Sequence, residues 1–263
     1  MREMEWTLYF SPDSGIMKAM ETLRREADSM PDDLTIALDC APIIHFDENE
    51  TIPVRAVGYT VFRKTAKSVS FPGRTVNVPD NAAFTVEYAY YFDYDIEHMY
   101  DLEHIWVTVG KDGEVLSVEG SFHGKYLVLL VPGLHGSLLP AGRHVHAFCQ
   151  PGKHAFLPVG DLFRIVPRWD VCCLEEAGGP VLIGNPFCAA HSPTGKDLFK
   201  PTAGDDARSR RYMKENLSFR PSLRFRETVL NDAVYMPWRE LFDLIPGWIG
   251  AECGRLRTLY GEE

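Results

Sequence analysis

The densest run of potential metal ligands lies at residues 93–104, immediately before an apolar segment. Its donors are Asp95, His98, Asp101 and Glu103. Carboxylate oxygens suit hard cations such as Mg²⁺ and Ca²⁺, and an imidazole widens the choice to Mn²⁺, Fe²⁺ or Zn²⁺. We therefore predict a divalent-cation site and leave the identity of the metal open. The alternative interpretation is a solvated acidic loop in which Asp101 turns the chain.

The segment that follows this run indicates which way the acids point. If a strand covers Ile105–Val109 and extends back to residue 101, alternation places Asp101 and Glu103 on the face of its apolar side chains. Buried carboxylates are costly unless they are hydrogen-bonded, paired with a cation or bound to a metal. No Lys or Arg occurs between Arg74 and Lys111 to neutralise them locally.

Two further histidines, His123 and His154, fall in turn-like settings and are candidates to complete the site. Their placement depends on the hairpin turn at Asp112-Gly113, because glycine readily adopts the positive backbone angles of a tight turn. A two-residue turn would pair Glu103 with Phe122, whereas a three-residue loop would place His123 opposite Asp101. The sequence leaves this register open.

The elements around the run predict a mainly β (α+β) fold with a central antiparallel β-sandwich, an N-terminal helix and peripheral C-terminal helices. Apolar residues recur at helical intervals over residues 14–30. Later helices are expected from Asp205 to Arg211 and from Trp238 to Ile245. The expected strands are Thr35–Leu38, Val54–Phe62, Phe84–Phe92, Ile105–Val109, Val115–Val118 and Tyr126–Val131.

Composition sets limits on the whole chain of 263 residues. We expect a single domain, with the N-terminal helix in residues 1–33, the sandwich in 34–170 and a packing extension in 171–263. The formal charge of −10 argues against nucleic-acid binding, which depends on clustered basic residues. No apolar run is long enough for a transmembrane segment, and six scattered cysteines favour a reducing cytoplasm.

Residues 97–103 resemble the Gly-His-Arg-His-Asp-Trp-Glu heptad of the necrosis-and-ethylene-inducing-peptide-like proteins. The first His, the Asp and the final Glu match at His98, Asp101 and Glu103. In that family these positions help to bind a divalent cation, together with an upstream Asp that here corresponds to Asp95. The Gly, Arg, second His and Trp of the heptad are replaced, so the toxic activity of the family is not implied.

The resemblance covers roughly residues 40–158 and extends to the related vacuolar-protein-sorting-type domains. Their Asp-Trp-Glu-His-Val, Ser-Gln-His-Gly and Gly-Ser-His-Ala motifs are similar to segments of this chain. These segments are 101–105, 121–124 and 152–155, and residues 41–47 look like the opening strand of the same domains. The resemblance implies a central β-sandwich surrounded by helices.

We therefore expect a cytoplasmic, metal-binding β-sandwich that recognises an anionic or polyhydroxyl ligand, such as a glycan or a lipid head group. One alternative is a metal-dependent hydrolase, in which the cation activates water and Glu103, His123 or His154 moves the proton. The other alternative is a structural or partner-binding protein without activity. The sequence does not choose among Mg²⁺, Ca²⁺, Mn²⁺ and Zn²⁺, and it does not set the oligomeric state.

Overall fold

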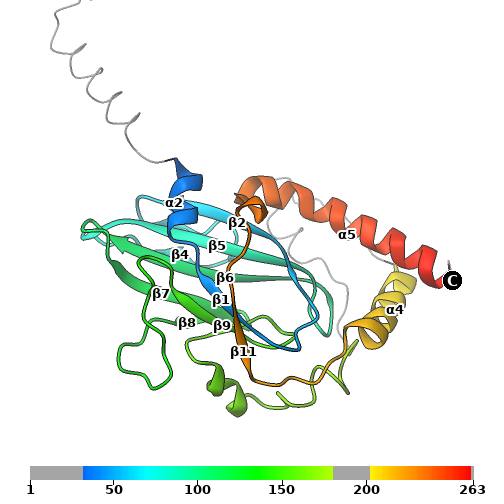
Figure 1. Cartoon of the computed structure of the whole chain (residues 1–263). Helices are drawn as coiled ribbons and strands as arrows, with labels where there is room; N and C mark the ends of the chain where they lie inside the picture. The colour runs from blue at the N-terminus through cyan, green and yellow to red at the C-terminus, as the bar shows by residue number, and fades with distance from the viewer. Residues whose placement is uncertain (1–31, 180–201, 262–263) are drawn as a thin grey trace, which may run out of the picture. The chain divides into compact units, whose positions relative to one another are not determined.

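Two β-sheets form the centre of the part of the chain that this computed structural model describes, which comprises residues 32–179 and 202–261 (Figure 1). The strands are β1 (Ile43–Asp47), β2 (Val54–Phe62), β3 (Ala66–Lys67), β4 (Thr75–Val76), β5 (Ala82–Tyr94), β6 (Met99–Gly110), β7 (Val115–Phe122), β8 (Lys125–Val128), β9 (His146–Cys149), β10 (Phe156–Leu157), β11 (Phe225–Thr228) and β12 (Tyr235–Pro237). One sheet has the order β10-β9-β1-β11, and the other has the order β12-β2-β5-β6-β7-β8.

The two sheets pack face to face around a common core. Alternate residues of β1, among them Ile44 and Phe46, enter the same apolar cluster as Ile105 and Val107 of β6. The predicted mixed α+β class with a central sandwich is therefore confirmed. The sheets are not wholly antiparallel, however, because β1 pairs with β9, and β2 with β12, in parallel.

Helices surround the sheets. The α-helices are α2 (Asp33–Asp39), α4 (Ala203–Tyr212) and α5 (Trp238–Tyr260), and shorter helical turns are η1 (Gly160–Ile165), η2 (Met213–Leu217) and η3 (Asp232–Val234). Helix α5 covers the face of β2 and β5 that points away from the four-stranded sheet (Figure 1). A Cβ on Gly58 would lie 2.8 Å from the Trp238 ring, which shows how closely the helix approaches β2. Strand β5 is therefore covered on both faces, which explains its almost continuous apolar run.

Several predicted elements have different bounds or a different type. The expected strand Thr35–Leu38 is wrong, because these residues form helix α2, with Ile36 and Ala37 buried. The expected helix from Trp238 to Ile245 continues through Pro246 as far as Tyr260. The helix expected from Asp205 to Arg211 is confirmed within α4, whose Thr202 and Asp205 form a capping box. The helix predicted over residues 14–30 lies outside the described residues.

The segment after residue 170 contributes strands as well as helices. Strand β11 pairs with β1 in one sheet, and β12 pairs with β2 in the other. Both pairings join residues that are far apart in sequence. No described helix is long and apolar enough to cross a bilayer.

The β6–β7 hairpin resolves the register that the sequence left open. Ile105 lies opposite Gly120, and an irregularity near Val109 separates this register from the turn. The turn itself has three residues, 111–113, closed by the Gly110 amide donating to the Glu114 carbonyl. The irregularity shifts the register by one residue, so the pairing continued by two residues would set Glu103 opposite Phe122. In this register His123 would lie opposite Leu102 instead of Asp101, and it belongs to the turn between β7 and β8.

Candidate metal site

The turn between β5 and β6 positions the first two predicted ligands. Tyr94 pairs with Met99, so the four residues 95–98 close the turn, and the Asp95 amide donates to the His98 carbonyl. The Asp95 carboxylate is buried and accepts the Glu97 amide at 2.6 Å, as aspartates in turns commonly do. The His98 ring hydrogen-bonds through Nδ1 to the Tyr100 carbonyl, and its Nε2 lies 3.6 Å from Asp95.

Strand β6 directs the next two acids inward, as the alternation predicted. Asp101 is partly buried, and Glu103 is 7 % exposed on the face that carries Ile105. One Asp101 oxygen lies 3.0 Å from His154 Nδ1, and the other accepts the Leu102 amide at 2.8 Å. The Ser121 hydroxyl donates to Glu103.

The loop between β9 and β10 supplies the groups that face these acids. His154 is fully buried, and its ring stacks on Phe92 with 3.8 Å between the ring centroids. Its Nδ1 faces Asp101, whereas its Nε2 has no hydrogen-bond partner among the described residues. The Lys153 ammonium lies 2.8 Å from Asp95 and 3.0 Å from Glu97.

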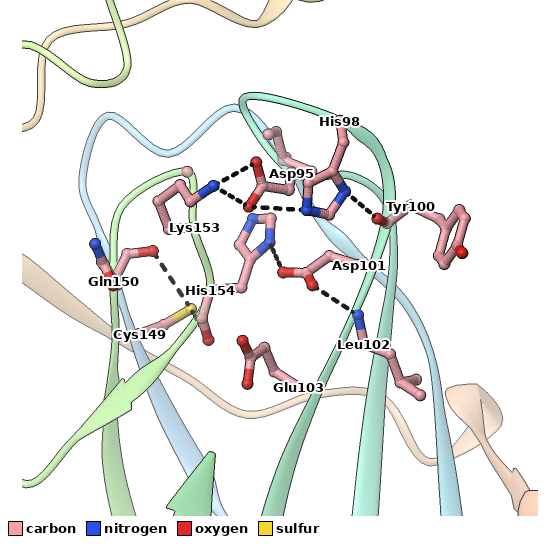
Figure 2. Close-up of polar contacts among 12 residues, drawn as sticks. Asp95, His98, Tyr100, Asp101, Leu102, Glu103, Cys149, Gln150, Lys153 and His154 are labelled. Atoms are coloured by element: carbon pink, nitrogen blue, oxygen red, sulfur yellow. Dashed lines mark hydrogen bonds and ion pairs between the residues drawn. The ribbon is translucent and has the colours of Figure 1, made fainter. Parts of the chain in front are cut away.

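Figure 2 shows these side chains converging on one region from two hairpin-like segments. We call this group the acidic cluster, and it consists of Asp95, His98, Asp101, Glu103, Lys153 and His154. A fourth carboxylate, that of Glu50, borders it by accepting the Gly152 amide at 2.7 Å. His123 instead hydrogen-bonds through Nε2 to the Gln150 side chain at 2.9 Å. Thus five of the six predicted ligands come together, and His123 contacts the loop that carries His154.

The acids of the cluster differ in their protonation. Burial and the nearby Asp101 charge raise the pKa of Glu103 well above its usual value. Burial also tends to raise the pKa of Asp101, but the hydrogen bond and the charge of His154 hold it below its usual value. The pKa of His154 is raised, because Asp101 and Glu50 outweigh its burial. Burial raises the pKa of Glu50 as well.

Sequence reasoning missed the roles of Lys153 and Glu50. Lys153 directly precedes the predicted ligand His154 in the segment 152–155, and this position could have indicated that Lys153 lies near the cluster. Glu50 lies in an acidic stretch, residues 47–50, with nothing in the local pattern to distinguish it. Both reach the cluster through contacts between distant segments.

A second group of ligand-type side chains lies on the four-stranded sheet. His45, His146 and Glu227 each offer one ligand atom, and these atoms all lie within 4.8 Å of one another, close enough to hold a metal ion. Among the described residues, no other group of three His, Cys, Asp or Glu side chains brings its ligand atoms this close together. The acidic cluster does not meet this distance criterion.

Comparisons with known proteins give one distant structural similarity. No family model matches the sequence, and no curated protein matches it. The chain is similar to the crystal structure of a triple mutant of NLPPya, a necrosis-and-ethylene-inducing-peptide-like protein. That similarity has a TM-score of 0.32 and 16% sequence identity, and it covers 49% of this chain and 71% of the other. A likeness of this size transfers neither residue roles nor activity.

Proposed function

We propose that this protein binds a divalent cation at the acidic cluster and uses it to recognise an anionic or polyhydroxyl ligand, such as a glycan or a lipid head group. The observation that carries the proposal is an excess of acid in a largely buried region. The three carboxylates of the cluster and Glu50 share two basic groups, Lys153 and His154. Charges removed from water need a counterion or a proton, and a divalent cation supplies the missing charge.

The residues present fit an oxygen-preferring ion. Asp101 and Glu103 would supply carboxylate oxygens, and His154 would orient Asp101 through its Nδ1. Asp95 would join them if Lys153, whose side chain is 14% exposed, turned outward. His98 borders Asp95, and His123 would act indirectly by holding Gln150 in the same loop. A bound cation would then offer its remaining positions to ligand oxygens.

Protonation is the rival explanation for the same excess of acid. The raised pKa values of Glu103 and Glu50 mean that a proton can neutralise each of them without any metal. A cation and a proton compete for the same oxygens, so cation binding should strengthen as pH rises. This competition makes the two explanations separable by experiment.

The test compares an isosteric change inside the cluster with one just outside it. Metal content and melting temperature should be measured for the full chain with Ca²⁺, Mg²⁺, Mn²⁺ and Zn²⁺, each against a chelator. Asp101→Asn should abolish stabilisation by the preferred cation. Asp93→Asn is the control, because Asp93 lies on the neighbouring strand β5 and pairs with Arg55 at 2.7 Å.

The proposal is supported if an added cation stabilises the wild-type chain and the Asp93→Asn variant but not the Asp101→Asn variant. The absence of any cation effect on the wild-type chain would overturn it and favour the protonated, structural alternative. Turnover of phosphoester, glycoside or ester panels that is lost in chelator and in Asp101→Asn would instead identify a metal-dependent hydrolase.

A further inference from the structure

A separate set of ligand-type side chains lies across three adjacent strands of the four-stranded sheet. His45 of β1 lies directly opposite Glu227 of β11, and His146 begins β9 on the other side of β1. Ile44 and Phe46 flank His45 in sequence and enter the core, so alternation directs His45 to the outer face of the sheet. Ala147 of β9 is also buried in that core, which places His146 on the same outer face.

The distances suit one shared ion. His45 Nε2 lies 2.9 Å from His146 Nδ1. Two ligand nitrogens, each about 2.1 Å from a tetrahedral zinc, stand roughly 3.4 Å apart, so a small opening of this pair would admit the ion. The Phe148 ring stacks on His45 at 4.5 Å between centroids and fixes the plane of the imidazole.

The electrostatics of the pair suit metal binding rather than a charged histidine. Burial, and for His45 also the neighbouring His146, lowers the pKa of both rings. Neutral imidazoles keep the nitrogen lone pair that a metal requires, so little proton release is needed near neutral pH. Glu227 brings the anionic ligand, and it is exposed, so this side of the group faces solvent.

We propose that His45, His146 and Glu227 bind a divalent transition-metal ion, with Zn²⁺ as the expected occupant. Two imidazoles and one carboxylate favour Zn²⁺, Cu²⁺ or Ni²⁺ over Ca²⁺ and Mg²⁺, which prefer oxygen ligands. Three protein ligands leave one tetrahedral position open, and the exposed Glu227 places that position toward solvent. The site therefore takes an exchangeable fourth ligand, such as water or a small anion. It is independent of the acidic cluster, which is expected to select a harder ion.

The experiment titrates Zn²⁺ into the chelator-treated full chain in an excess of Mg²⁺ and Ca²⁺, which keeps oxygen-rich sites occupied. One zinc equivalent should bind to the wild-type chain. His146→Ala should abolish this equivalent, and Glu227→Gln should weaken it by about tenfold or more. These two positions are used because His45 is 6 % exposed and its loss would disturb the sheet. His135→Ala is the matched control, since His135 is an exposed histidine in a loop outside the group.

Electron paramagnetic resonance of the Cu²⁺-loaded chain gives a readout that a structural role would not move. Coupling to two nitrogens is expected in the wild-type chain and should be lost in His146→Ala. Retention of the zinc equivalent by His146→Ala, or its absence from the wild-type chain, would overturn the assignment. Asp101→Asn should keep this equivalent, so failure of the acidic cluster to bind a cation and failure of this site remain distinguishable.

Discussion

The acidic cluster and the His45/His146/Glu227 group hold ligand-type side chains in opposite ways. In the acidic cluster, carboxylates are largely removed from water, and Lys153 and His154 neutralise part of their charge. In the other group, the histidine pKa values are lowered, and the single carboxylate is exposed. The first region carries a high electrostatic cost when no ion is bound, and the second carries almost none.

Because of this difference, the two regions should differ in how folding stability and metal binding depend on their side chains. An internal counterion such as Lys153 keeps the acidic cluster folded without a metal, but it also competes with the metal for Asp95. The neutral histidines need no counterion, so nothing comparable stands in the way of an ion. Substitutions in the acidic cluster should therefore change stability and cation response together, whereas substitution of the exposed Glu227 should change binding alone.

The largest effect is expected from Lys153→Met. This change leaves Asp95 buried without its ammonium partner, and breaking a buried ion pair from one side costs about 3–5 kcal/mol of unfolding free energy. Denaturant unfolding in chelator should show this loss. Added divalent cation should recover much of it, because the ion replaces the missing positive charge.

Arg63→Met is the control for Lys153→Met. Arg63 pairs with Asp33 at 2.7 Å, but both side chains are well exposed, at 40% and 49%. Such pairs contribute about 1 kcal/mol or less, and no cation should recover that loss. Equal losses from the two substitutions would show that Asp95 is solvated and would remove the premise of the comparison.

A smaller effect, with a sign that depends on conditions, is expected from Glu103→Gln. The pKa of Glu103 is raised in the folded chain by burial and by Asp101, so the folded state binds this proton more tightly than the unfolded state. The resulting stability is complete below the unfolded-state pKa and is lost as pH rises through the folded-state pKa. The amide mimics the protonated acid, so Glu103→Gln should be more stable than the wild-type chain at alkaline pH in chelator.

Added cation should reverse that order. A divalent ion stabilises the ionised Glu103 of the wild-type chain, whereas glutamine is a weaker ligand, so the variant should gain less. Melting curves at several pH values, with chelator and with cation, measure both effects. A variant that is less stable in chelator at every pH would contradict the raised pKa.

The sequence predicted those parts of the site that local patterns determine. Alternation along Ile105–Val109 placed Asp101 and Glu103 on the inward face. The Asp112-Gly113 turn predicted the hairpin but left its register open, because the register depends on the irregularity near Val109. The type of Thr35–Leu38 was mistaken, because a short β-branched and apolar run fits a buried strand and a short helix equally well. A strand at those residues would have left Asp33 without the favourable position it holds in the first helical turn.

The remainder depends on contacts that no local pattern records. Strand β11 is four residues long, and it brings Glu227 opposite His45 across more than half of the chain. Lys153 is likewise distant from Asp95 in sequence, and it reaches Asp95 from the loop between β9 and β10, which belong to the other sheet. Short strands with few side chains carry little periodic signal, so their partners emerge only when the sheets assemble.

The smallest effect on stability is expected from Glu227→Gln, and it completes the contrast with Lys153→Met. Glu227 is exposed, and an isosteric surface change away from buried networks alters the free energy of unfolding by about 0.5 kcal/mol or less. Denaturant unfolding in chelator should therefore be almost unchanged, while added Zn²⁺ should raise the melting temperature of the wild-type chain more than that of the variant. A marked loss of stability in chelator would mean that Glu227 anchors the β1–β11 pairing, and the two regions would then not differ in the way described.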